Sequence, residues 1–196
     1  MREAMIERRT GETDIALHLR LDGTGTYEVD TGVGFLNHML ELFARHGGFD
    51  LKLRCKGDVH VDAHHTVEDV AIVLGRAFDQ ALGERRGIRR YGSCILPMDE
   101  ALILTAVDIS GRGVLGYALE IPAQKVGDFD TELTEEFMGA FARSLGAAVH
   151  LRQLAGTNSH HIIEGAFKSL ARSLGEAVAI DGRNADRIPS TKGTIL

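Results

Sequence analysis

A short motif, His-His-x-x-Glu, occurs once in each half of this chain of 196 residues, over residues 64–68 and 160–164. The residues upstream of the two copies also match. The matching pairs are Phe43-Ala44-Arg45 with Phe141-Ala142-Arg143, Gly48 with Gly146, and Leu53-Arg54 with Leu151-Arg152. Self-similarity of this kind is typical of a duplicated structural unit. We therefore expect the chain to fold as two similar halves.

Hydrophobic periodicity predicts the elements of each half. Helical spacing of apolar residues predicts helices over residues 35–46, 64–82, 137–145 and 163–174. Apolar runs and alternation predict strands over residues 14–21, 51–55, 102–109, 114–121 and 149–154. The expected fold is α+β with an internal duplication, in which each half is a small sheet covered on one side by helices.

No linker rich in Pro or Ser separates the halves. We expect residues 1–92 to form the first half, residues 93–182 the second, and residues 183–196 a C-terminal tail, together in one compact unit. The tail is polar, and such a composition taken alone is typical of a loose terminus.

The motif has the spacing of a metal site. Positions i and i+4 lie on one face of a helix, so His64 with Glu68, and likewise His160 with Glu164, can bind one ion. An imidazole with a carboxylate suits Mn, Fe or Zn. The adjacent His65 and His161 lie about 100° round the helix and point away from its apolar stripe. We expect them to complete metal sites of a neighbouring copy, which predicts two ions per site and an obligate oligomer.

The repeat also indicates a third ligand for each ion. When Phe43 is aligned with Phe141, His38 falls opposite Glu136. We predict that these two side chains are the matching third protein ligands.

Among the 22 Lys and Arg residues, four scattered cations are candidates for anion binding: Arg90, Arg112, Lys168 and Lys192. Lys168 lies one turn beyond Glu164 on the same predicted helix. A cation beside these carboxylates indicates an anionic ligand group near the metals, such as phosphate.

Composition excludes several classes of protein. The formal net charge of −6 argues against a broad nucleic-acid surface. Cys55 and Cys94 match neither a disulfide framework nor a zinc motif, and they fit a reducing compartment. The first ten residues lack the apolar segment of a signal peptide, and no apolar run approaches the roughly 18 residues of a membrane span. We expect a cytoplasmic protein with no nucleic-acid or membrane partner.

Three functions stay open from these residues alone. The first is a lyase. The second is a di-metal hydrolase with a bridging hydroxide, because His and Glu clusters beside cations also suit phosphate-ester cleavage. The third is a non-catalytic shell protein that metal ions hold together.

Three motifs, in this order, resemble the signatures of the imidazoleglycerol-phosphate dehydratase family. They are Asp30-Thr31-Gly32-Val33-Gly34-Phe35-Leu36-Asn37-His38-Met39, Asp62-Ala63-His64-His65-Thr66-Val67-Glu68-Asp69 and Ser159-His160-His161-Ile162-Ile163-Glu164. The resemblance covers essentially the whole chain, from Arg9-Thr10-Gly11-Glu12-Thr13 to Ser190-Thr191-Lys192-Gly193. It implies an enzyme of histidine biosynthesis that converts D-erythro-imidazole-glycerol phosphate to imidazole acetol phosphate and water.

The resemblance implies more about the assembly and the site. The fold is a twofold repeat of a unit like domain 2 of ribosomal protein S5, in a 24-subunit homo-oligomer with active sites between subunits. Each site holds two Mn²⁺ ions, although other divalent ions such as Fe, Co and Zn are possible. The implied metal ligands are His38, His64, His65, Glu68, Glu136, His160, His161 and Glu164. The family often has His where Glu136 stands.

The remaining roles also follow from the resemblance. Glu12 matches the family's acid/base and Asp99 its site acid. The phosphate contacts match Arg90, Arg112, Lys168, Ser190 and Lys192. We expect the tail residues Ser190, Thr191 and Lys192 to fold over the phosphate once substrate binds.

The implied reaction has one physical difficulty, because the proton to be lost lies on a carbon with no adjacent carbonyl. If each ring nitrogen of the substrate coordinates one ion, the ring ionises to a di-metal-bound imidazolate. The imidazolate can expel hydroxide from the adjacent side-chain carbon and give a diazafulvene-like intermediate. A base, which we assign to Glu12, then removes the next proton, and the enol tautomerises to the ketone.

Overall fold

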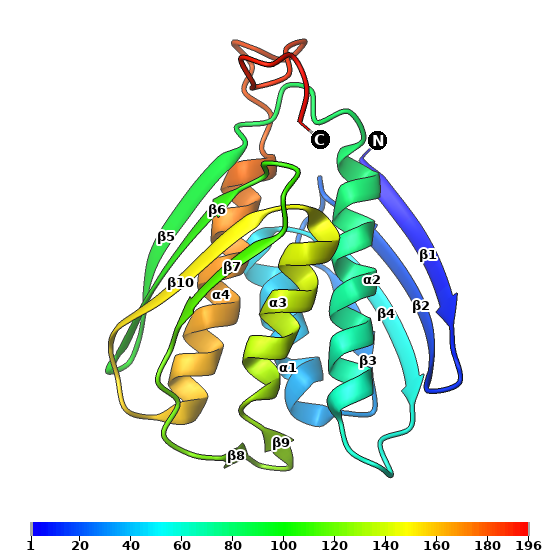
Figure 1. Cartoon of the computed structure of the whole chain (residues 1–196), viewed down its shortest axis with the longest axis vertical. Coiled ribbons are helices and arrows are strands. Elements are labelled where there is room, and N and C mark those ends of the chain that lie inside the picture. The colour runs from blue at the N-terminus through cyan, green and yellow to red at the C-terminus, as the bar shows by residue number, and fades with distance from the viewer. Residues whose placement is uncertain (1, 196) are drawn as a thin grey trace.

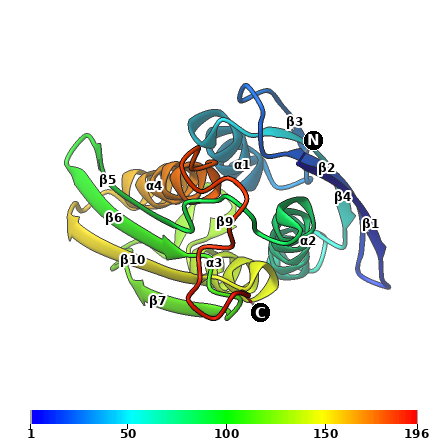
Figure 2. The same ribbon diagram turned by 90° about the horizontal axis from the view of Figure 1, so that it is seen from above.

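Two four-stranded sheets enclose a middle layer of helices in this computed structural model, which describes residues 2–195 (Figures 1 and 2). The first sheet has the strand order β1-β2-β4-β3 and the second β5-β6-β10-β7. The first sheet contains β1 (Glu3–Arg9), β2 (Thr13–Arg20), β3 (Tyr27–Asp30) and β4 (Asp50–Gly57). The second contains β5 (Tyr91–Met98), β6 (Ala101–Asp108), β7 (Val114–Ala118) and β10 (Ala148–Ala155).

The two sheets have the same internal arrangement. In each sheet an antiparallel hairpin, β1-β2 or β5-β6, continues into a third antiparallel strand, and the fourth strand is parallel to the third. A small hairpin of β8 (Lys125–Val126) and β9 (Phe129–Asp130) is added in the second half. This repeated topology confirms the α+β fold of two sheet-plus-helix halves.

The helices of residues 2–195 pack against the sheets in pairs. They are α1 (Gly34–Gly47), α2 (His64–Leu82), α3 (Leu133–Leu145) and α4 (Ser159–Val178). Helices α1 and α2 contact the first sheet, and α3 and α4 contact the second. Between the sheets, α2 contacts α3 and α1 contacts α4 (Figure 2). Each half therefore meets the other through its helices.

Aromatic side chains hold this helical layer together. Phe43 of α1 and Phe78 of α2 lie in the first half, while Phe141 of α3 lies in the second. The ring centroids are 6.2 Å apart between Phe43 and Phe141, and 5.7 Å between Phe78 and Phe141. All three rings are buried. Aromatic pairs in this range add to the burial of apolar area that drives packing.

The two shorter helices also end alike. Gly48 follows α1 with φ +74°, and Gly146 follows α3 with φ +70°, both in the left-handed region that glycine adopts without strain. The helices expected over residues 137–145 and 163–174 begin earlier, at Leu133 and Ser159. The polar residues of these first turns have no helical apolar spacing, which is why periodicity alone did not include them.

The tail is packed, contrary to its composition. The Gly87 N–H donates to the Arg187 carbonyl at 2.8 Å, and the Asp181 N–H donates to the Gly87 carbonyl at 2.7 Å. The guanidinium of buried Arg85 donates to the Ile195 carbonyl at 2.9 Å. These contacts tie the C-terminal segment to the loop after α2. Within residues 2–195, no helix is both long and apolar enough to cross a bilayer.

Candidate metal centre and substrate site

The first cluster of metal-ligand side chains joins the two halves. Helix α2 begins at His64, so His64 and Glu68 lie one turn apart on the face that meets α3. Glu136 stands in the first turn of α3. One ligand atom from each of these three side chains lies within 4.8 Å of the others. An imidazole with two carboxylates is a donor set that suits Mn²⁺, so the side chains present fit a divalent ion.

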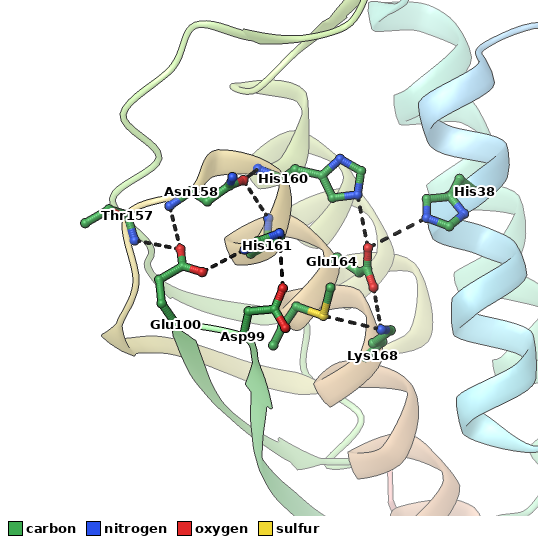
Figure 3. A network of polar contacts seen from close by, with 10 residues as sticks. His38, Asp99, Glu100, Thr157, Asn158, His160, His161, Glu164 and Lys168 are labelled. Atoms are coloured by element: carbon green, nitrogen blue, oxygen red, sulfur yellow. Dashed lines mark hydrogen bonds and ion pairs between the residues drawn. The ribbon is translucent and has the colours of Figure 1, made fainter.

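The second cluster repeats this arrangement with the halves exchanged (Figure 3). His160 and Glu164 come from α4, and His38 comes from α1. Oε2 of Glu164 lies 3.0 Å from Nε2 of His160 and 3.7 Å from Nε2 of His38. His38 and Glu136, which align in the repeat, therefore occupy corresponding places in space. His38 joins the motif residues of the second half, and Glu136 joins those of the first half.

Lys168 neutralises the second cluster. Its ammonium pairs with Oε1 of Glu164, one helical turn earlier. Burial raises the pKa of the Glu164 carboxyl, but Lys168 and His160 outweigh burial and hold that pKa below its ordinary value. The carboxylate form of Glu164 is thus favoured despite its burial.

Side-chain oxygens hold the helix starts that carry the paired histidines. Asn158, at the N-terminus of α4, accepts the N–H of His160 at 2.9 Å and of His161 at 3.2 Å. Asp62 accepts the N–H of His64 at 2.8 Å before α2. These bonds satisfy N–H groups that a helix start leaves free, and they stabilise the first turns that carry the histidines.

The second histidine of each pair points away from its cluster. Nδ1 of His65 lies 2.9 Å from Asp58 Oδ2, and its Nε2 lies 3.6 Å from Glu12 Oε1. These carboxylates raise the pKa of His65, with the hydrogen bond to Asp58 as the main cause. The predicted acid/base Glu12 and the predicted ligand His65 are therefore neighbours in the structure.

The second half repeats this environment around His161 (Figure 3). Nδ1 of His161 lies 2.7 Å from Glu100 Oε2, and Nε2 lies 3.6 Å from Asp99 Oδ2. The hydrogen bond from His161, with backbone N–H groups that include Asn158, lowers the pKa of Glu100 to about 2. Asp99 thus stands beside His161 as Glu12 stands beside His65. Asp58 and Glu100 are contacts that sequence reasoning missed, and only the acidic pair Asp99-Glu100 gave a signal for one of them.

Hydrogen bonds of Thr10 and Thr13 hold the turn that carries Glu12. The Thr10 hydroxyl accepts the N–H groups of Glu12 at 3.1 Å and Thr13 at 3.0 Å. The Thr13 hydroxyl donates to the buried Asp69 carboxylate at 2.5 Å, and Arg8 pairs with the same oxygen at 2.5 Å. Asp69 follows Glu68 on α2, so one helix positions both a candidate metal ligand and the Glu12 turn.

The expected phosphate contacts divide between the two ends of the molecule. Lys168 lies beside the second cluster, whereas the Arg90 N–H bonds to Ala177, near the end of α4. At 1.5 Å per residue, Ala177 lies about 25 Å along the axis from His160. Arg90 pairs with Asp108 at 2.7 Å and donates to the Pro189 carbonyl at 2.9 Å. Pro189 precedes Ser190 in the tail.

Arg112 and the tail residues lie on the Arg90 side. Ile109 donates its N–H to the Arg90 carbonyl at 3.1 Å, and the turn carrying Arg112 follows directly. Ser190 accepts the N–H of Lys192 at 3.2 Å through its hydroxyl. In Figure 1 the tail lies at the end of the molecule opposite to the starts of α2 and α4. One chain therefore does not bring these cations to the metal clusters.

Comparison with known proteins gives one consistent result. The family model of imidazoleglycerol-phosphate dehydratase matches residues 31–174. Curated dehydratases of this name from Jannaschia sp. (strain CCS1) and Desulforamulus reducens are 56% and 57% identical, and the alignments cover at least 98% of each chain.

Solved structures of this name give the same result. The dehydratase of Staphylococcus aureus has a TM-score of 0.84 and 37% identity, covering 91% of this chain and 99% of that one. The Pyrococcus furiosus enzyme, solved in complex with (S)-C348, has the same TM-score and identity over 96% of this chain and 99% of its own. The chain belongs to the imidazoleglycerol-phosphate dehydratase family, which confirms the resemblance found in its motifs.

Proposed function

We propose that this chain removes water from D-erythro-imidazole-glycerol phosphate to give imidazole acetol phosphate in histidine biosynthesis, at a site that holds two Mn²⁺ ions. The observation that carries the proposal is the pair of candidate metal clusters, one of His64, Glu68 and Glu136 and one of His38, His160 and Glu164. Each cluster combines side chains from a helix of the first half and a helix of the second. Two clusters related by the internal repeat provide for two ions related in the same way.

We assign the six clustered side chains as metal ligands, together with His65 and His161 contributed by another copy of the chain. They are His38, His64, His65, Glu68, Glu136, His160, His161 and Glu164. Bound Mn²⁺ supplies Lewis acidity, which lowers the pKa of a coordinated imidazole ring. The Glu164 carboxylate is paired with the Lys168 ammonium, so this cluster carries little net charge before an ion binds.

Glu12 and Asp99 are the proton-transfer groups of the proposal. The reaction breaks the C–O bond at the carbon next to the ring and the C–H bond at the following carbon. Glu12 accepts the carbon-bound proton, and Asp99, the site acid, donates a proton to the hydroxide that leaves as water. Both carboxylates are exposed, with 54% of the Glu12 side chain and 73% of the Asp99 side chain accessible. A substrate held by another copy can therefore reach them.

The site is assembled between copies of the chain. The distance of about 25 Å along α4 supports this, because the substrate is far shorter than the gap between His160 and Arg90. Arg90, Arg112, Ser190 and Lys192 of one copy bind the phosphate of a substrate at the metals of another, with Lys168 beside them. The full assembly has 24 copies, and the tail closes over the phosphate to exclude water. The unpaired Cys55 and Cys94 support a cytoplasmic location.

The experiment is incubation of the metal-stripped protein with the substrate, with and without Mn²⁺, followed by mass spectrometry of the products. We expect a Mn²⁺-dependent loss of one water with the phosphate retained. Release of inorganic phosphate would contradict the proposal and indicate a hydrolase. Absence of any product from assembled, metal-loaded protein would also contradict it.

A further inference from the structure

In the first half, the second histidine of the motif, His65, has a carboxylate beside Nδ1, on the side of the ring away from Nε2. We call His65 and His161, its counterpart in the second half, the outward imidazoles. Nδ1 of His65 lies 2.9 Å from Oδ2 of Asp58. The backbone N–H of Asp58 donates to the Glu12 carbonyl at 3.1 Å, which fixes the loop that carries the carboxylate. Oδ1 of Asp58 is buried and has no hydrogen-bond partner among the described residues. The Asp58 side chain is therefore committed to His65.

The outward imidazole of the second half has the same kind of partner, supplied from a different place. Nδ1 of His161 lies 2.7 Å from Oε2 of Glu100 (Figure 3). Oε1 of Glu100 accepts the N–H groups of Asn158 at 2.8 Å and Thr157 at 3.2 Å. Both oxygens of Glu100 are thus engaged, one by the imidazole and one by the start of α4.

The two carboxylates do not occupy equivalent positions in the repeat. Asp58 lies in the loop between β4 and α2, whereas Glu100 lies in the turn between β5 and β6. The loop before α4, residues 156–158, contains no acidic residue. A carboxylate therefore contacts Nδ1 of the histidine in both halves, although the two carboxylates come from loops that do not correspond in the repeat. Duplication of one local structure does not explain this.

The contact has a chemical consequence for the other ring nitrogen. A carboxylate only accepts hydrogen bonds, so its partner Nδ1 carries the proton of a neutral imidazole. Nε2 then has a free lone pair, which is the form that binds a metal. The carboxylate oxygens of Glu12 and Asp99 lie 3.6 Å from Nε2 of His65 and of His161, respectively, beyond hydrogen-bond distance. The lone pair stays available.

We propose that Asp58 and Glu100 are positioning residues that fix the tautomer and ring direction of His65 and His161, so that each Nε2 is presented to an ion. The proposal rests on the proposed function, in which these imidazoles are metal ligands. Carboxylates that orient ligating histidines in this way change metal affinity by about 10- to 100-fold when they are replaced.

The test measures Mn²⁺ affinity of the assembled chain by competition with a chelator. In Glu100→Gln, the amide oxygen keeps the two backbone N–H groups while the amide nitrogen faces His161. That donor requires an unprotonated Nδ1, which moves the proton to Nε2. We expect Glu100→Gln to weaken Mn²⁺ binding by about 10- to 100-fold.

Asp58 offers the complementary pair of variants. Asp58→Ala removes the acceptor and should weaken Mn²⁺ binding by a similar factor, whereas Asp58→Asn can turn its amide oxygen to His65 and should bind within a few-fold of wild type. Glu28→Gln, an exposed carboxylate of β3 paired with Lys52, is the matched control. Melting temperatures of the metal-free proteins show that the variants fold, since a purely structural role would lower them.

The outcomes separate this proposal from the proposed function. Wild-type Mn²⁺ affinity in both Glu100→Gln and Asp58→Ala would overturn it, as would an Asp58→Asn variant as weak as Asp58→Ala. If the wild-type chain itself binds no Mn²⁺, the proposed function fails as well. Weakened binding with unchanged melting of the metal-free protein supports the positioning role.

Discussion

Nε2 of His38 lies 3.7 Å from Oε2 of Glu164, although the two residues belong to different halves of the chain. Glu136 stands in the same relation to His64 and Glu68. Both clusters occur where helices of one half contact helices of the other. An ion bound at either place therefore links the halves, and loss of a third ligand should reduce metal binding without disturbing the sheets.

Glu136 tests the first cluster. We expect Glu136→Ala to lower Mn²⁺ affinity at least about tenfold, because it removes one of three clustered ligands. Glu136→His should retain binding, since imidazole is also a ligand for Mn²⁺. The neighbouring carboxylate variant Glu135→Ala is the control. Equal Mn²⁺ affinities of Glu136→Ala and Glu135→Ala would show that Glu136 is not a ligand.

Glu12 tests the proton transfer. Glu12→Gln keeps the shape of the side chain and loses its basicity, so we expect kcat to fall about 10²- to 10⁴-fold. Mn²⁺ affinity should change by no more than a few-fold, because Glu12 belongs to neither cluster of candidate ligands and only stands 3.6 Å from Nε2 of His65. Steady-state kinetics and metal analysis check both statements, with Glu7→Gln of β1 as the control. Activity above about a tenth of wild type would remove Glu12 from this role.

The C-terminal tail tests the phosphate contacts. Deletion of the residues after Asp186 removes Ser190 and Lys192, together with the Ile195 carbonyl that Arg85 binds. We expect KM for the substrate to rise about tenfold or more. Mn²⁺ affinity should be retained, because the clusters of the same copy lie at the opposite end of the molecule. Enzyme kinetics at saturating Mn²⁺ measure the change. An unchanged KM would contradict a lid over the phosphate.

Asp50 tests the electrostatics of the first sheet. Burial raises its pKa, but N–H groups of Thr24 and Thr26 outweigh burial and lower the pKa to about 2. A carboxyl whose pKa is lowered on folding stabilises the fold fully at pH values above its ordinary pKa of 3.8. This stabilisation is lost as the pH falls toward the folded-state pKa of about 2. Asp50→Asn should therefore melt below wild type at pH 7, and the difference should shrink in acid. A difference independent of pH would contradict this cause.

The sequence predicted most of the helical layer and both clusters, because duplicated motifs and helical spacing are local signals. The helix expected over residues 64–82 is α2 as observed, and His38 with Glu136 was found by aligning the halves. Strands β1, β3 and β5 were not predicted, nor were the two-residue strands β8 and β9. β3 has four residues, and the outward side of β1 is mostly charged. A short or charged edge strand gives little periodic signal.

Other parts of the site depend on tertiary contacts that no local pattern contains. The bonds from Asp58 to His65 and from Glu100 to His161 join loops to helix starts. The distance between Arg90 and the clusters depends on the direction of α4, which motif spacing does not give. The packing of the tail depends on acceptors for the buried Arg85 guanidinium, whereas polar composition alone indicated a loose terminus.

The most direct test of the account is complementation between two inactive variants. His64→Ala damages the metal end, and Arg90→Ala damages the phosphate end. If each site combines the ends of different copies, subunits mixed after dissociation and reassembled with Mn²⁺ should regain up to about a quarter of wild-type activity, the random share of sites with both ends intact. Each variant reassembled alone should remain inactive. Mixed assemblies, verified by mass, that regain no activity would contradict a site shared between copies.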